Sequence, residues 1–140
     1  MARRGNGLTV RLRRLTGDRG AAAVEFALVV PVLLLLVFGV AEFGRAYNIQ
    51  TTLSGAAREG ARTMALQNDV SAANAATVAA ARPLELSGGQ ISVSPDACPL
   101  SGTTSADTVR VTVTYQMPFV TSLFGSGLRL TGNGVMQCNG

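Results

Sequence analysis

The chain has 140 residues, of which 47% are hydrophobic and 14% are charged, a length that accommodates one domain. Its net charge is +4 and its pI is near 10.0. The basicity is confined to residues 1–20, which hold six Arg and one Asp, whereas residues 21–140 hold six Arg and seven acidic residues. We therefore expect no nucleic-acid partner, because no basic patch follows the first twenty residues.

The same composition argues against catalysis. The sequence contains no His, the commonest general acid or base, and its carboxylates are scattered singly rather than paired. No Ser follows a nucleophile-elbow pattern, and no glycine-rich stretch carries the Lys of a phosphate loop. We expect no enzymatic activity, no catalytic residue, no cofactor and no bound metal.

An apolar segment follows the basic one. Residues 26–41 carry no charge, and residues 21–25 extend the segment to twenty-one residues. A helix of that length rises about 1.5 Å per residue and therefore crosses a bilayer core of about 30 Å. The Arg residues on its N-terminal side predict that this end stays in the cytoplasm and that the remaining chain lies outside.

Three interpretations of this N-terminus compete. The first is a cleaved secretory signal, for which Gly39-Val40-Ala41 offers a small-x-small cleavage site. The second is an uncleaved signal anchor. Both leave Glu25 unexplained, because a charged residue at the bilayer centre costs about 2.5–3.5 kcal/mol on insertion scales. Near the membrane edge that cost is lower, since the side chain can reach the headgroups.

The third interpretation accounts for the whole pattern. The segment resembles the processing site of type IV prepilins, in which a basic leader ends in Gly and four residues precede Glu, an aromatic residue and an apolar helix. Here Gly20 would end the leader, and Ala21 would become the mature N-terminus. Glu25 and Phe26 would be the fifth and sixth mature residues. Together with the continuation EFGR at 42–45, the segment is similar to the TadE-like minor pilins or pseudopilins of tight-adherence (Flp-type IV) pilus systems.

The resemblance implies a function. A prepilin peptidase would cut after Gly20, and the product would act in pilus assembly and surface adhesion with other pilin subunits and the assembly machinery. The chain would cross the bacterial cytoplasmic membrane once, among lipids, with its C-terminal part periplasmic or extracellular. Glu25 would meet a neighbour's α-amine and favour staggered packing of the helices. The alternative is a membrane-anchored or secreted envelope binding domain unrelated to pili.

The helical pattern continues beyond the span. One apolar stripe at helical spacing contains Ile49, Leu53, Ala56 or Ala57, Gly60 and Met64. Glu42 with Arg45, and Glu59 with Arg62, are spaced as ion pairs on the outer side of that helix. A second, shorter helix is expected to start after Asn68 or Asp69 and to end before Pro83.

The pattern then changes to the two-residue period of strands. We predict strands at 91–94, 108–117 and 128–137. In the second, one face carries Val109, Val111, Val113, Tyr115 and Met117. In the third, Leu128 and Leu130 are expected to face inward, and Asn133-Gly134 is either a tight hairpin turn or a bulge.

The two cysteines fall in the part predicted to lie outside, where disulfides persist. Cys98 precedes the central strand and Cys138 follows the last one, and we expect them to pair. A disulfide between them would close the intervening chain into a loop, which contributes roughly 4 kcal/mol to the free energy of unfolding in the chain-entropy model. A redox or metal role is disfavoured, because the sequence has neither a Cys-x-x-Cys motif nor a His.

Together these patterns predict an α+β, pilin-like fold. A long N-terminal transmembrane helix would carry a small antiparallel β-sheet head packed on its outer half. The predicted parts are a basic prepilin leader at 1–20, a transmembrane assembly helix at 21–41, a helical extramembrane spine at 42–86 and a β-rich head with a disulfide at 87–140.

Overall fold

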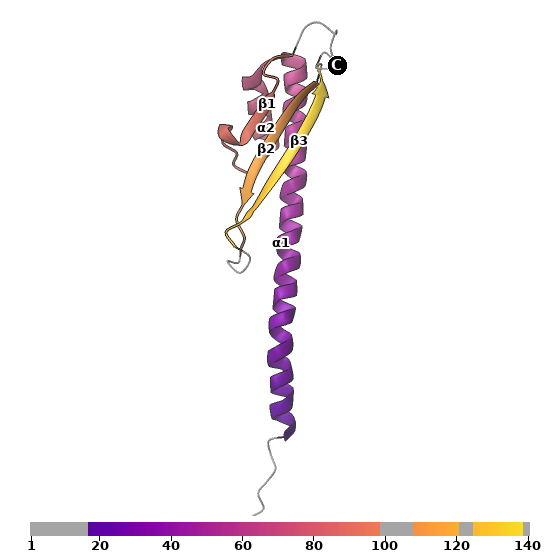
Figure 1. The fold of residues 1–140 in the computed structure, drawn as a ribbon, viewed down its shortest axis with the longest axis vertical. Coiled ribbons are helices and arrows are strands. Elements are labelled where there is room, and N and C mark those ends of the chain that lie inside the picture. Colours follow the sequence, from indigo (N-terminus) through magenta and orange to yellow (C-terminus); the bar gives the residue numbers. More distant parts are fainter. Residues whose placement is uncertain (1–16, 99–107, 121–124, 139–140) are drawn as a thin grey trace, which may run out of the picture. The chain divides into compact units, whose positions relative to one another are not determined.

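The computed structural model describes residues 17–98, 108–120 and 125–138 (Figure 1). The chain forms an α+β fold, as predicted, with a long N-terminal apolar helix and a small three-stranded antiparallel sheet. In chain order the elements are α1 (Gly17–Gln67), α2 (Val70–Ala80), the 3₁₀ turn η1 (Gly88–Gln90), β1 (Ile91–Ser94), β2 (Thr108–Met117) and β3 (Leu128–Gln137). The chain divides into two compact units, one up to Gly39 and one from Val40 onward.

In the first unit the described residues belong to α1 alone. Its large apolar side chains from Val24 to Phe38 are mostly exposed, and Pro31 lies inside the helix. The described part of this unit therefore has no core in which these side chains could be buried.

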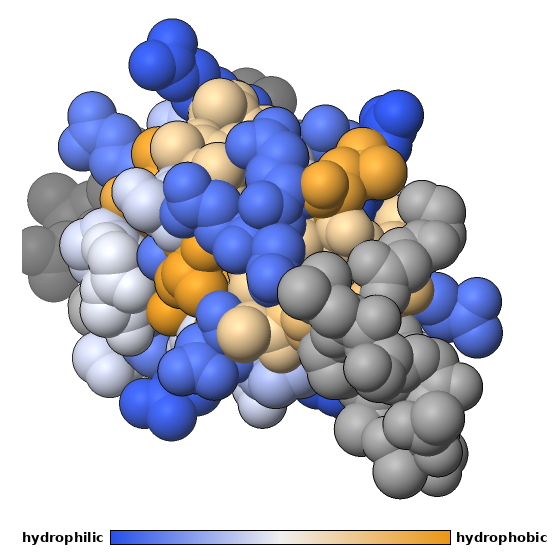
Figure 2. Space-filling view, turned by 90° about the horizontal axis from the view of Figure 1, so that it is seen from above, coloured by the Kyte–Doolittle hydropathy of each residue, from blue (hydrophilic) through white to orange (hydrophobic). Residues whose placement is uncertain are grey.

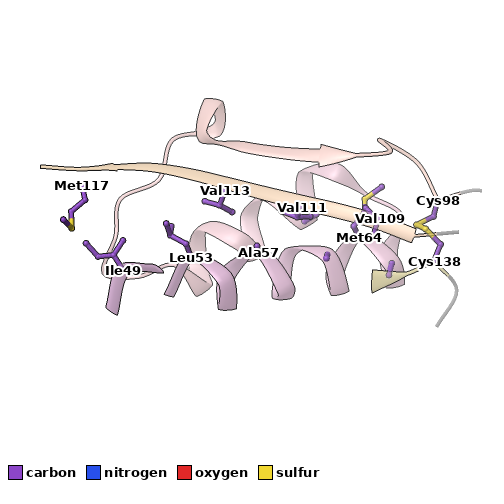
Figure 3. Packing of buried hydrophobic residues seen from close by; sticks show 13 residues of the cluster. Ile49, Leu53, Ala57, Met64, Cys98, Val109, Val111, Val113, Met117 and Cys138 are labelled. Carbon is purple, nitrogen blue, oxygen red and sulfur yellow. A yellow bond between two sulfur atoms is a disulfide. The ribbon is translucent and has the colours of Figure 1, made fainter. Parts of the chain in front are cut away.

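The second unit has its core between α1 and the sheet. The predicted helical stripe is buried, including Ile49, Leu53, Ala57, Gly60 and Met64. Their spacing of three or four residues places them on one side of the helix. This stripe forms the surface on which the sheet packs (Figure 3).

Strand β2 supplies the other half of the core. It lies in the centre of the sheet, with β1 and β3 antiparallel on either side. Its inward side chains are those predicted from the alternating pattern: Val109, Val111, Val113 and Met117 are buried, and Tyr115 is partly buried. Figure 3 shows Met117 near Ile49 and Val109 near Met64, so β2 runs antiparallel to α1.

Strand β3 departs from the sequence expectation in two ways. Asn133-Gly134 is neither a hairpin turn nor a bulge, because β3 pairs with β2 without interruption from Leu128 to Gln137. Leu130 is partly buried as expected, but Leu128 is 42% exposed. Figure 1 shows that β3 crosses α1 obliquely, so that the start of the strand lies to one side of the helix.

The two buried residues on the inner face of β3 are glycines. A Cβ atom added to Gly132 would collide with the α1 backbone at Leu53, and one added to Gly134 would collide with it at Ala57. Two residues of a strand advance about 6.8 Å and four residues of a helix about 6 Å, so the two contacts stay in step. The Gln50 side chain adds a hydrogen bond from Nε2 to the Thr131 carbonyl, at 2.7 Å.

The junction between the helices is fixed by two polar residues. Asn68 adopts a positive φ of 51° and donates its N–H to the Met64 carbonyl, ending α1. Its side-chain Oδ1 accepts a hydrogen bond from the Cys98 N–H at 2.6 Å. Asp69 caps α2 by accepting from the N–H groups of Ser71 and Ala72.

Two further contacts close this end of the unit. Gly60 of α1 lies so near Thr77 of α2 that a Cβ atom would strike the Thr77 hydroxyl. Cys98 and Cys138 form the expected disulfide, which joins residues 40 positions apart. The second unit is thus held by its core, by close backbone contacts and by one covalent link.

Replacing both cysteines by Ser should lower the free energy of unfolding by about 4 kcal/mol, because the closed loop restricts the unfolded chain. Chemical denaturation in detergent micelles, followed by circular dichroism, measures this. Replacing Ser94 by Ala, at an exposed position of β1, is the control. Equal midpoints for the oxidised protein and the double variant would contradict the prediction.

Gly134→Ala should lower the free energy of unfolding by about 1–3 kcal/mol, since the added methyl group forces β3 away from the α1 backbone. Gly88→Ala is the matched control, because a Cβ atom at Gly88 meets nothing within 4 Å. The same denaturation experiment compares the two. Equal stabilities for both variants would show that the glycine contact does not limit the helix–sheet distance.

Candidate assembly helix and processing site

Gly20 lies near the start of α1 and is exposed. A Cβ atom added there meets no atom within 4 Å, so packing within the chain does not require glycine. In a helix interior glycine costs about 1 kcal/mol relative to Ala. The fold therefore provides no packing reason for a glycine at this position, as is also the case for Gly39, Gly44 and Gly55 in the same helix.

Glu25 and Phe26 follow on the same helix. Both side chains are exposed. Glu25 lies four residues after Ala21, one turn further along the same side. It makes no hydrogen bond or ion pair with any residue that the structure describes. The helix thus aligns the predicted processing site with a carboxylate that has no partner among the residues that the structure describes.

These residues open the most apolar stretch of the protein. Among the described residues, only Gly20–Gln67 is a helix long and apolar enough to cross a membrane. Its most apolar eighteen-residue stretch has a mean hydropathy of 2.7, and none of that stretch is buried in the protein. Such a surface is compatible with a membrane anchor, since lipid or neighbouring helices can cover it.

Comparison with known families adds a finding on this same segment. The family model described as TadE-like protein matches residues 20–62. We call residues 20–62 the TadE-like segment. The TadE-like segment begins at Gly20, includes the apolar stretch, and ends within the part of α1 that packs on the sheet. The resemblance expected from the motif is therefore confirmed for this segment. No curated protein and no solved structure matches the chain.

Within the TadE-like segment, the predicted ion pair between Glu42 and Arg45 is wrong. Glu42 and Arg45 were expected to form an exposed ion pair, but Glu42 is only 8% exposed and the two do not pair. Glu42 Oε1 accepts a hydrogen bond from the Val120 N–H, and Arg45 Nη1 donates to the Pro118 carbonyl at 3.1 Å. Glu42 and Arg45 therefore each bind the backbone that follows β2 instead of each other.

A signal for this arrangement was present in the sequence. Glu42 lies seven residues before Ile49, so it continues the buried stripe of α1 backwards by two turns. The second predicted pair behaves as expected for a surface contact: Arg62 Nη1 lies 4.0 Å from Glu59 Oε2, and both side chains are exposed. An exposed pair of this kind contributes little to stability.

The remaining surface offers less defined chemistry. Within the described ranges no group of three His, Cys, Asp or Glu side chains could hold a metal ion. An open groove of about 570 Å³ lies between α1 and β3, beside Arg62, Leu66 and Met136. It contains no pair of titratable groups suited to proton transfer. The start of the TadE-like segment, with Gly20 and Glu25, is therefore the candidate functional site.

Proposed function

We propose that the protein is a minor pilin or pseudopilin of a tight-adherence (Flp-type) pilus. A prepilin peptidase would cut it after Gly20, and the mature protein would act in pilus assembly and surface adhesion. One observation carries the proposal: the TadE-like segment starts at a glycine that the fold does not require, directly before an exposed apolar helix. A plain anchor explains neither the glycine nor Glu25.

The proposed location follows from charge and cysteine use. Six Arg residues precede Ala21, which favours retention of the N-terminus in the cytoplasm. The second unit would then lie in the periplasm or outside the cell, where the Cys98–Cys138 disulfide is stable. Its partners would be the peptidase, other pilin or pseudopilin subunits, the assembly machinery and membrane lipid. We propose neither catalysis nor nucleic-acid binding for it.

The position of Gly20 suits a peptidase at the membrane face. The first four N–H groups of a helix have no partner within the helix, and Gly20 is the fourth residue of α1. Opening this first turn therefore breaks only the hydrogen bonds that its carbonyls accept. The missing side chain would also let the peptidase approach the bond between Gly20 and Ala21 closely.

Cleavage would give Glu25 a role. A free α-amine on Ala21 is largely protonated at neutral pH. Among bundled apolar helices, the Glu25 carboxylate of one subunit would pair with the amine of another, and the low dielectric would strengthen the attraction. An unpaired copy would be costly, so only a staggered arrangement of subunits would be stable.

The mature N-terminus provides the direct test. Mass spectrometry of the protein from its native membrane should find Ala21 as the first residue, whereas Glu42 would indicate conventional secretion and an intact leader would indicate a plain anchor. Gly20→Phe should abolish processing. Gly39→Phe is the matched control, because Gly39 also has open space around it in α1 and belongs to the alternative signal-peptidase site. Processing blocked by Gly39→Phe alone would refute the proposal.

Glu25→Ala should leave membrane insertion and cleavage intact but lower incorporation into sheared pili about 100-fold. The reason is that a stranded amine in an apolar bundle costs about 3 kcal/mol or more. Immunoblots of the sheared and membrane fractions measure the ratio. Glu59→Ala removes an exposed carboxylate from the same helix and should assemble normally. Equal incorporation of both variants would exclude the assigned role of Glu25.

A further inference from the structure

One end of the second unit combines exposed apolar side chains with positive charge. Phe43 and Tyr47, one turn apart on α1, are 75% and 66% exposed, and Val120 after β2 is 73% exposed. We call this end the basal surface, and it consists of Phe43, Arg45, Tyr47, Val120, Leu128 and Arg129. Figure 2 shows the opposite end, where hydrophilic side chains cover much of the surface and apolar ones are scattered.

Hydrogen bonds hold the parts of the basal surface together. The Val120 N–H donates to Glu42, 78 residues away, and Arg45 donates to the Pro118 carbonyl, 73 residues away. Because Glu42 and Arg45 are less than one turn apart, residues 118–120 lie against a single turn of α1. Leu128 pairs with Met117 in the sheet, which places the start of β3 beside the same turn.

Chain connectivity alone puts this turn next to the apolar segment. Gly39 is the last residue of the first unit, and Glu42 follows it by three residues of continuous helix, about 4.5 Å. The headgroup layer extends about 5–8 Å beyond the hydrocarbon core on each side. Because the Val120 N–H is hydrogen-bonded to Glu42, a membrane that covered the apolar segment up to Gly39 would bring its headgroup layer close to residues 118–120.

The charge of the basal surface is of one sign. Glu42 is the sole carboxylate in residues 40–58, and it is buried, while residues 108–140 contain none. Arg45 and Arg129 are exposed. Basic side chains near a membrane are attracted by anionic lipid headgroups, and exposed aromatic residues favour the interface.

We propose that the basal surface rests on a lipid bilayer that contains anionic headgroups. Phe43, Tyr47 and Val120 enter the headgroup layer, and the two Arg side chains contact lipid phosphates. This inference rests on the membrane insertion of α1 under the proposed function. It adds a second attachment to the membrane, which fixes the height and tilt of the head before assembly.

Tryptophan fluorescence tests the contact, since the chain has no Trp of its own. The full-length protein would be reconstituted into phosphatidylcholine vesicles, with and without phosphatidylglycerol, that carry bromine at shallow or deep acyl positions. Val120→Trp and Phe43→Trp report on the basal surface. Leu66→Trp is the matched control, being exposed on α1 at the opposite end, and Leu34→Trp reports on insertion.

Shallow bromine should quench Val120→Trp at least about twofold more than Leu66→Trp, and phosphatidylglycerol should increase the difference. Adding Glu42→Ala should reduce quenching at Val120 but not at Phe43, because it releases residues 118–120 only. Quenching at Leu34 without quenching at Val120 would overturn this inference and leave the membrane anchor intact. Absence of quenching at Leu34 would overturn both this inference and the membrane insertion of α1. A blue-shifted Val120→Trp emission without quenching would indicate a protein partner instead and would also overturn it.

Discussion

The second unit depends on the contact between the β3 glycines and the backbone of α1. Side chains normally keep a sheet about 10 Å from its packing partner, but Gly132 and Gly134 let β3 touch the helix directly. This contact sets the height of the sheet along α1, since each glycine meets a defined turn. Three other contacts between α1 and the sheet side of the unit are consistent with that height: the β2 valines on the helical stripe, the Gln50 hydrogen bond and the hydrogen bonds to residues 118–120.

One helix carries two different surfaces. Up to Gly39 most of its large apolar side chains are exposed, and from Val40 onward one side is buried under the sheet while the other side is exposed. The TadE-like segment spans this change, so it contains both the candidate membrane anchor and the support for the sheet. Glu42 lies just after the change: its Oε1 accepts the hydrogen bond that links Val120 to the helix, and its Oε2 is buried without a partner among the described residues.

Much of this arrangement could be predicted because periodic patterns report burial on one face. The stripe from Ile49 to Met64, the alternation of β2 and the limits of the three strands all came from such patterns, and the structure confirms them. Two predictions were wrong because they depended on which distant residue a side chain or backbone contacts, and not on a periodic pattern. The Asn133-Gly134 pair is typical of turns, but here the glycine is needed for a close approach that a local sequence cannot reveal. Glu42 was paired with its nearest cation, because the distant Val120 N–H has no local signature.

The disulfide has a mechanical consequence. A pull on the chain beyond Cys138 passes through the sulfur–sulfur bond to Cys98, and from there to the strand β1 and to Asn68 at the end of α1. This covalent path does not pass through the β2–β3 pairing, so the pull does not separate the two strands one hydrogen bond at a time. The remaining load acts along strands that run beside α1, and their hydrogen bonds share it in shear. The disulfide therefore gives Cys138 a covalent path to α1 that leaves out residues 99–137.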